Sequence, residues 1–411
     1  MTIPKNIRMY SILFLIALAV RLIYIVGFYG LNRITDSDSP EYYAYAVNLA
    51  EHGTYTDGVW TVFRAPGYPA YMAVVIKIFG NSLAKIQISQ AFVSSCIPVL
   101  VFMIATLVDS NPSVALIAGI VSCFHFGLID EPAHIISEAT FTMLYALILL
   151  LSIKSADSSL ASVATGAILA LEWLTRPVAI ILLPFISLWI ILKSGLPTGI
   201  KRTTIICVVT AAIMMPWWLR NYRLHRAFIP SALQTGFVLK HTNYPHNAIN
   251  AGALSAYDNL TEIQRDRLHM KDALEYIRQQ PMMGQIIKKL VGTLYFFYPF
   301  LPAFDIFYVA LLPFCVIGLY RSVILRNVNQ WLLFSMFMYL PVCFVFNVST
   351  RYRHSIMPAF IIVAASGLTS WHIQFKGRKW YQPLMTGWIG INLIVLAFAP
   401  QIRMLMKSIL F

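Results

Sequence analysis

The stretch RITDSDSPEYYAYAVNLAEHG contains two aspartates, Asp36 and Asp38. A carboxylate can accept a proton from an attacking hydroxyl group, so both are candidates for a general base. The alternative is that they only help to start a helix. Ser39, Pro40 and Glu41 form the better helix start, because serine caps helices and proline suits the first turn. We therefore expect Ser39 to be the cap and Asp38 to lie just outside the helix.

The residues after Pro40 have the spacing of an amphipathic helix. Tyr42, Tyr45 and Leu49 lie at positions i, i+3 and i+7, so they share one apolar and aromatic face. Such a helix fits the outer surface of a bilayer. We expect Tyr42 to support the site beside Asp38.

The motif FRAPGYP comes next and joins a loop to a second apolar stretch. Its prolines stiffen the turn, and Gly67 permits another backbone segment to approach closely. We expect an interfacial helix over 66–80, which is too short to count as a membrane span. Arg64 and Tyr68 are candidates to support the site, but an ordinary junction between a loop and a helix would have the same composition.

Glu138 opens a further apolar stretch in the motif HIISEATF. A carboxylate there can interact with the positive end of a helix dipole, or it can face a polar cavity, and both alternatives stay open. Asp130, Glu131 and His134 lie close by in the sequence. Together they could hold a divalent metal, but their spacing specifies no particular metal.

Arginines stand at the ends of several apolar stretches. A guanidinium suits a phosphate group because it donates two parallel hydrogen bonds. The alternative is that these side chains only extend to the water at the membrane surface. Arg351 and Arg353 are separated by one residue, so on an extended segment they would share a face. The motifs are LTRPVA with Arg176, PWWLRNYR with Arg220, and STRYRHSIMP with Arg351 and Arg353.

The composition is that of an integral membrane protein. Of the 411 residues, 58% are hydrophobic and 12% are charged, and the mean hydropathy is +0.69. A soluble domain has about 45–50% apolar and about 25% charged residues. The net charge of +14 fits lipid phosphate and basic inner loops, so we expect no nucleic-acid partner. Arg21 lies inside the first apolar stretch and should face a polar partner.

Apolar stretches recur along the whole chain, and a span needs about 20 apolar residues. We therefore expect an all-α integral membrane protein, a polytopic helix bundle of about 11 spans. Lys5 and Arg8 precede the first span, which places the N-terminus on the inner side. The expected spans lie near residues 9–29, 84–107, 113–129, 137–153, 158–174, 177–192, 203–219, 304–320, 330–347, 355–373 and 381–399.

Alternation across the membrane divides the chain into three expected parts. Residues 1–219 form an N-terminal membrane module whose first outer loop, 30–69, carries the two aspartates. Residues 220–300 form an outer segment with the surface helix SAYDNLTEIQRDRLHMKDALEYIRQQP, which a proline ends. Residues 301–411 are C-terminal membrane helices. The expected location is an inner or plasma membrane, with the active site facing the periplasm or the outside.

The order of these motifs resembles a known family. A first span containing RL is followed by DS with a tyrosine four residues after the aspartate, then by RAPGYP, SE, RP, PWWLRNY and RYRHSIMP. This order resembles the lipid-carrier-dependent glycosyltransferases of the GT-C class. It is most similar to the bacterial group related to protein O-mannosyltransferases and to the aminoarabinose transferases of lipid A. The resemblance runs from about residue 8 to about residue 370.

The resemblance implies a GT-C-like helix bundle with interfacial helices in the first outer loop. It implies that Asp38 is the catalytic aspartate, because Tyr42 follows it at the family's spacing of four. Asp36 has Pro40 at that spacing and so takes a supporting role. Glu138 corresponds to the second acidic position of the family pattern.

The resemblance also implies the substrates. Family members take a sugar from a polyprenyl monophosphate and transfer it to an acceptor outside the cytoplasm. Arg351 and Arg353 match the family's late arginine cluster, and with Arg220 they are the expected ligands of the donor phosphate. Arg64 and Arg176 would support the site. The acceptor could be a glycan, a lipid or a protein, and a divalent metal is an open alternative.

Two other functions fit a membrane protein with a basic outer surface. One is a glycan polymerase or ligase that uses a lipid pyrophosphate donor, because its arginines would look similar. The other is a flippase for lipid-linked glycans. Transporters usually place functional charges near the middle of the bilayer on matched halves of the chain. Here the charges gather at the outer span ends and the sequence has no matched halves, which favours an enzyme.

Overall fold

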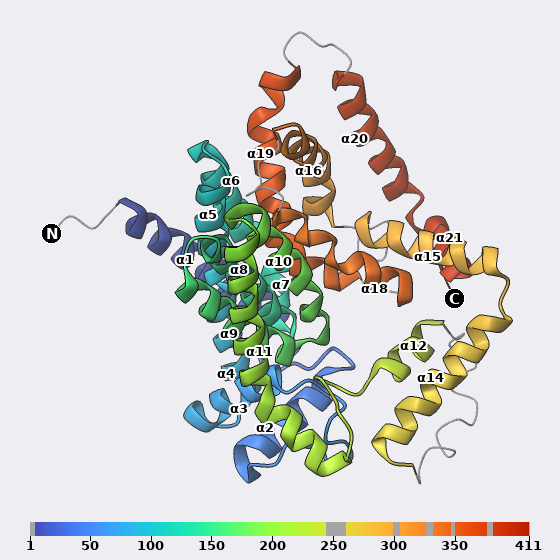
Figure 1. The fold of residues 1–411 in the computed structure, drawn as a ribbon. Helices are drawn as coiled ribbons and strands as arrows, with labels where there is room; N and C mark the ends of the chain where they lie inside the picture. Colours follow the sequence, from blue (N-terminus) through green and yellow to red (C-terminus); the bar gives the residue numbers. More distant parts are fainter. Residues whose placement is uncertain are drawn as a thin grey trace. The chain divides into compact units, whose positions relative to one another are not determined.

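The computed structural model describes residues 5–243, 260–298, 305–325, 332–346, 350–375 and 381–410 (Figure 1). These described residues form helices joined by turns and loops, with no β-strand among them. The all-α prediction is therefore confirmed.

The chain divides into two compact units. Unit 1 comprises Met1–Ala232, Phe314–Met336 and His354–Thr369, and unit 2 comprises Leu233–Pro313, Phe337–Arg353 and Ser370–Phe411. The predicted C-terminal part, 301–411, contributes segments to both units. The helices α16 (Ile306–Leu325) and α19 (Met357–Phe375) each begin in one unit and end in the other.

Unit 1 holds the first eleven α-helices. Helices α8, α9 and α11 pack side by side in it (Figure 1). These eleven helices are α1 (Lys5–Tyr24), α2 (Ser39–His52), α3 (Gly67–Phe79), α4 (Leu83–Ser94), α5 (Cys96–Val108), α6 (Pro112–Phe124), α7 (Phe126–Asp130), α8 (Glu138–Ser155), α9 (Ser159–Thr175), α10 (Leu182–Ser194) and α11 (Leu196–His225).

Unit 2 holds α12 (Thr235–Asn243), α14 (Glu262–Gln279), α15 (Met282–Phe297), α18 (Leu340–Val345), α20 (Tyr381–Ala397) and α21 (Ala399–Leu410). Helix α14 is the predicted surface helix. Thr261 and Gln264 form a capping box at its start, in which each side chain bonds the other residue's backbone N–H. Pro281 follows its end, as the sequence predicts. Residues 255–259 of the predicted helix lie outside the described residues.

The structure does not confirm the count of 11 spans. Seven described helices are long and apolar enough to cross a membrane, or eight if the bent pair Pro112–Phe124 and Phe126–Ala133 is one span. These eight coincide with predicted spans. The predicted spans 158–174 and 381–399 are shorter apolar helices. The predicted span 330–347 falls on a 3₁₀-helix, Leu332–Tyr339, followed by the short α18, and parts of it lie outside the described residues.

The charged Arg21 faces the interior of unit 1, as its place in a span predicts. Its side chain is fully buried. Its Nε donates a hydrogen bond of 2.9 Å to Ser94 Oγ, and its Nη1 donates one of 3.2 Å to the carbonyl of Ala17. These bonds offset part of the cost of a charge at that depth.

A buried polar cluster joins the C-terminal segments of unit 1 to its N-terminal helices. Asp109 follows the end of α5 and accepts a 2.7 Å hydrogen bond from Ser366 Oγ of α19. Arg321 Nη1 of α16 lies 3.3 Å from the same Asp109 oxygen and donates to Ser366 Oγ at 3.0 Å. Three elements far apart in the sequence therefore meet at one carboxylate.

Replacing Asp109 with alanine should destabilise the protein by about 2–3 kcal/mol, because it leaves a part-buried guanidinium without its carboxylate. Thermal unfolding of the purified protein in detergent measures this effect. Asp157→Ala removes an exposed carboxylate and is the control that should melt like the wild type. Equal melting temperatures for Asp109→Ala and the wild type would contradict this account.

Candidate active site

The carboxylate of Asp38 points to a partner rather than to the helix it precedes. Helix α2 begins at Ser39, so Asp38 and not Ser39 is the N-cap residue, and the predicted cap was wrong by one position. The Asp38 side chain makes no capping hydrogen bond. Its Oδ1 instead lies 3.0 Å from Nη2 of Arg64. The carboxylate therefore pairs with Arg64 and does not cap the helix.

Arg64 is the centre of a small charged cluster. Its Nη2 lies 2.6 Å from Glu41 Oε2 and 3.0 Å from Asp38 Oδ1. Its guanidinium also lies over the rings of Tyr42, at 4.9 Å, and Phe63, at 5.1 Å. Burial alone would lower the pKa of Arg64, but Tyr42, Asp38 and Glu41 together raise the pKa above its ordinary value. Arg64 is therefore a permanent charge that fixes the position of Asp38.

Two tyrosines connect this cluster to a neighbouring segment. The ring of Tyr42 packs edge-on against the ring of Tyr68, with centroids 5.2 Å apart. The Tyr68 hydroxyl donates a 2.6 Å hydrogen bond to Gln90 Oε1. Gln90 Nε2 in turn donates to the carbonyls of Pro132 and His134. The predicted support residues therefore link residues 30–69 to the segment that precedes α8.

Gly67 allows this junction to form. A β-carbon at this position would lie 2.7 Å from Thr175 Oγ1 and 2.8 Å from the backbone of Leu174. The close backbone approach that the motif FRAPGYP predicts is confirmed, and it holds the start of α3 against the end of α9.

His134 joins the second aspartate to the segment before α8. Its Nδ1 lies 2.6 Å from Asp36 Oδ2, and its Nε2 lies 3.3 Å from Asp130 Oδ2. The hydroxyl of Tyr24 donates a 2.6 Å hydrogen bond to Asp130 Oδ1. Burial would lower the pKa of His134, but the hydrogen bonds and charges of Asp130 and Asp36 outweigh it and raise the pKa to about 9. The imidazolium therefore holds the first outer loop in place at neutral pH.

The stability of the protein should fall as the pH rises through about 9. The pKa of His134 in the folded state is above its ordinary value, so its ion pairs are fully present below about pH 6.5 and are lost near pH 9. We expect a loss of at most about 2–3 kcal/mol over this window. Thermal unfolding from pH 6.5 to 9.5 measures it, and His134→Gln should remove this part of the pH dependence. A His134→Gln profile parallel to the wild type would contradict the assignment.

Glu138 forms a buried ion pair at the start of α8. Its Oε1 lies 2.8 Å from Nη1 of Arg176, and only 2% of the Glu138 side chain is exposed. The Arg176 guanidinium also lies 5.6 Å from the ring centre of Phe141. The structure thus brings together two of the predicted site residues. Arg176 directly follows α9, whose last residues contact Gly67, so this pair lies at the same junction as Tyr68.

The acids and histidine that suggested a metal site do not gather into one. Thr142 Oγ1 donates a 3.3 Å hydrogen bond to Glu131 Oε2, and His354 Nδ1 lies 3.8 Å from Glu131 Oε1. Asp130 and Asp36 contact His134 instead. Among the described residues, no group of three or more histidine, cysteine or acidic side chains is placed to hold a metal.

Arg220 binds the first outer loop through backbone carbonyls. Its Nη1 donates to the carbonyl of Thr61 at 2.7 Å, and its Nη2 donates to the carbonyl of Tyr55 at 3.0 Å. The guanidinium also lies 4.8 Å from the ring centre of Trp217. The predicted phosphate ligand therefore helps to hold residues 55–61 against α11.

Arg351 and Arg353 belong to unit 2. They lie in a 3₁₀-helix, Thr350–Ile356, and not on an extended segment, where they would share a face. With three residues per turn, side chains two positions apart point in different directions. Arg353 is fully buried, with its guanidinium 4.3 Å from the ring centre of Tyr308 and Nη1 donating to the carbonyl of Phe296.

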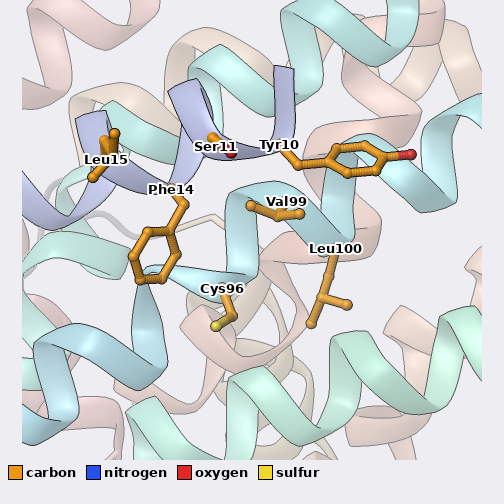
Figure 2. Close-up of a pocket in the computed structure, with 7 residues that line it drawn as sticks. All are labelled: Tyr10, Ser11, Phe14, Leu15, Cys96, Val99 and Leu100. Atoms are coloured by element: carbon orange, nitrogen blue, oxygen red, sulfur yellow. The ribbon is translucent and has the colours of Figure 1, made fainter. Parts of the chain in front are cut away.

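A pocket of about 560 Å³ lies between α1 and α5 (Figure 2). Its lining is mostly apolar and contains no charged side chain. The lining residues are Tyr10, Ser11, Phe14, Leu15, Cys96, Val99 and Leu100.

Known proteins share the fold of this chain, although their sequences differ widely. No family model matches the sequence, and no curated protein sequence matches it. Two crystal structures of the oligosaccharyltransferase of Archaeoglobus fulgidus, with a tethered acceptor peptide and in the apo form, are similar at TM-scores of 0.55 and 0.53 and 13% identity. The matches cover 96% of this chain but 53% and 54% of those chains, so this chain spans about half their length.

A weaker likeness is to ArnT from Cupriavidus metallidurans in the apo state. Its TM-score is 0.44 at 14% identity, and the match covers 90% of this chain and 80% of that one. A TM-score of this size does not establish a shared fold. The similarity to the oligosaccharyltransferase extends over nearly the whole chain and agrees with the helical architecture. The chain therefore shares the fold of the Archaeoglobus fulgidus oligosaccharyltransferase, a GT-C-like membrane helix bundle.

Proposed function

We propose that the protein is a membrane glycosyltransferase that moves a sugar from a polyprenyl-phosphate carrier to an acceptor on the outer side of the membrane. The observation that carries this proposal is the position of Asp38. It directly precedes an aromatic helix, and its Oδ1 lies 3.0 Å from Nη2 of Arg64. The GT-C fold and the order of the sequence motifs support the same reaction class.

In the proposed mechanism Asp38 is the general base. One carboxylate oxygen takes the proton of the acceptor hydroxyl as the acceptor oxygen attacks the anomeric carbon of the sugar. Attack opposite the phosphate forms the new glycosidic bond and breaks the bond between the anomeric carbon and the phosphate oxygen. The electron pair leaves with polyprenyl phosphate, and the configuration at the anomeric carbon is inverted. If the acceptor were already ionised, Asp38 would instead orient it.

The leaving phosphate gains negative charge as the bond breaks, and cations placed beside it would stabilise that charge. We propose Arg351 and Arg353 as the residues for this task, on the strength of their match to the family's late arginine cluster. Arg220 was a third candidate, but two of its nitrogen atoms bind carbonyls of the loop at 2.7 and 3.0 Å. These bonds favour a positioning role for Arg220 over direct contact with the donor.

The remaining predicted residues fit supporting roles. Arg64 and Tyr42 position Asp38, and Tyr68 fixes the loop through Gln90. Asp36 contributes through His134. The buried pair of Glu138 and Arg176 would shape the inner wall of the site, with Glu138 as the second acid of the reaction. The described residues do not fit a metal site, so no step is assigned to a metal.

Comparison of cells with and without the gene tests the proposal. Mass spectrometry of lipid, glycan and protein fractions should show that one sugar modification disappears while a polyprenyl-monophosphate sugar accumulates. Accumulation of a pyrophosphate-linked glycan would instead support a polymerase or ligase. Sugar-carrying lipid trapped on the inner side of the membrane would support a flippase.

A further inference from the structure

Among the described residues, two adjacent lysines of unit 2 have no acidic partner. Lys288 and Lys289 lie on α15 and are both part-buried. Lys288 Nζ donates to the backbone carbonyl of Asn243 at 3.4 Å, and Lys289 Nζ donates to Asn243 Oδ1 at 3.2 Å and to the carbonyl of Val345 at 3.1 Å. All three acceptors are neutral oxygens. The two ammonium groups therefore converge on one residue without a carboxylate between them.

The ammonium groups have hydrogen-bond donors left over. Each ammonium carries three N–H donors, and the described residues accept one from Lys288 and two from Lys289. Burial lowers the pKa of Lys288, and burial together with the charge of Lys288 lowers the pKa of Lys289 to about 8. Burial disfavours the charged form of both lysines, and no acidic group opposes either shift. An anion with several acceptor oxygens would satisfy these donors and restore the balance of charge.

The nearby carboxylates of α14 are already engaged elsewhere. Asp272 Oδ2 lies 2.6 Å from Nζ of Lys240. Asp266 Oδ1 accepts hydrogen bonds from the backbone N–H groups of Gly236 and Phe237, at the start of α12. Helix α15 itself contains no acidic residue. No carboxylate of the described residues therefore forms an ion pair with Lys288 or Lys289.

The same helix presents an exposed apolar face. Its members recur at helical spacing, and in water such a face would be unfavourable. An amphipathic helix with lysines and an exposed apolar face is typical of helices that lie in the plane of a membrane surface. The exposed residues are Met282, Met283, Ile286, Ile287, Leu290 and Leu294, with 41–79% of each residue exposed.

Helix α21 extends this face. It contacts α15 (Figure 1), and it exposes Met404 and Leu405 by 66% and 60%. We propose that α15 lies in the plane of the membrane surface and that Lys288 and Lys289 bind the phosphate of an anionic phospholipid. The apolar face covers the acyl chains, while the phosphate oxygens accept the free ammonium donors. This site is independent of the proposed sugar transfer.

Lipid binding by the purified full-length protein tests this proposal. Native mass spectrometry with phosphatidylglycerol and phosphatidylcholine should show preferential binding of phosphatidylglycerol by the wild type. The double variant Lys288→Gln/Lys289→Gln should lose about 10- to 30-fold in affinity for phosphatidylglycerol, because each lysine near an anionic surface contributes separately. Lys288→Arg/Lys289→Arg keeps both charges and should keep most of the binding.

A matched control separates this site from a general effect of charge. Lys271→Gln/Arg278→Gln removes two exposed positive charges from α14 and should leave binding unchanged. Equal affinity of the wild type and the Lys288→Gln/Lys289→Gln variant would overturn the proposal. So would an equal loss in the control. Binding of polyprenyl phosphate alone, without phosphatidylglycerol, would assign the lysines to a carrier lipid and would also overturn it.

A second measurement does not depend on the lysine variants being folded. Leu290→Trp places a fluorophore on the apolar face of α15 in an otherwise unchanged protein. In bilayers containing brominated phosphatidylglycerol, its added fluorescence should be quenched. Fluorescence that brominated lipid leaves unchanged would show that α15 does not lie in the membrane surface.

Discussion

Asp38→Asn should lower sugar transfer by about 10²–10⁴-fold, the range that a positioned general base contributes. Asparagine has nearly the same shape but cannot take the proton of the acceptor hydroxyl. The substitution also leaves Arg64 with Glu41 as its charged partner at 2.6 Å, so the loop should stay folded. Initial rates with a polyprenyl-phosphate sugar, together with the melting temperature, measure both effects.

A matched control for this variant lies in the same loop. Asp57 Oδ1 accepts hydrogen bonds from the N–H groups of Val59 and Trp60. An asparagine oxygen can accept the same bonds, so Asp57→Asn should transfer sugar at nearly the wild-type rate. If Asp38→Asn kept more than about a tenth of the wild-type rate, Asp38 would not be the base.

Arg64→Ala should lower transfer by about 100-fold, because a displacement of about 1 Å of a reacting group costs that much. The variant removes the contact that fixes Asp38 and leaves Glu41 without its partner. We expect the loss in kcat, with a smaller change in the KM for the donor. Steady-state kinetics in proteoliposomes separate the two parameters.

Two further variants show whether Arg64 acts through Asp38. Arg64→Lys keeps the charge but lacks the planar guanidinium that contacts Asp38 and Glu41 at the same time. It should therefore recover only part of the rate. Arg33→Gln removes an exposed arginine of the same loop and should have little effect. If Arg64→Ala combined with Asp38→Asn lost as much as the product of the two single losses, the two residues would act independently, and the positioning role would be wrong.

The local features of the first outer loop could be predicted from the sequence. The helix after Asp38, the close approach at Gly67 and the surface helix α14 follow from capping residues, glycine and apolar spacing. The start of α2 differs from the prediction by one residue, which changes the cap from Ser39 to Asp38. Boundaries of this kind depend on the last backbone hydrogen bonds, which residue preferences do not fix.

Contacts between distant residues could not be predicted. Asp36 and His134 are 98 positions apart, and no local pattern indicates their 2.6 Å contact. The same holds for Arg220, whose carbonyl partners lie about 160 positions earlier in the chain. The sequence showed that these residues carry charge, while the fold decides which groups they meet.

The relative orientation of Arg351 and Arg353 could not be predicted for a related reason. Two arginines separated by one residue share a face only on an extended backbone, and the segment is a 3₁₀-helix.

The count of spans could not be fixed from the sequence, because hydropathy measures the composition of a window of residues. It does not register that Leu332–Tyr339 is a 3₁₀-helix rather than part of one continuous α-helix.

The products that the purified protein forms from the donor test the central claim most directly. Wild-type protein in proteoliposomes, given a polyprenyl-monophosphate sugar and an acceptor extract, should consume the donor and release polyprenyl phosphate. Asp38→Asn, with an unchanged melting temperature, should leave the donor intact. Release of a pyrophosphate product, or equal consumption of the donor by the wild type and Asp38→Asn, would contradict the account.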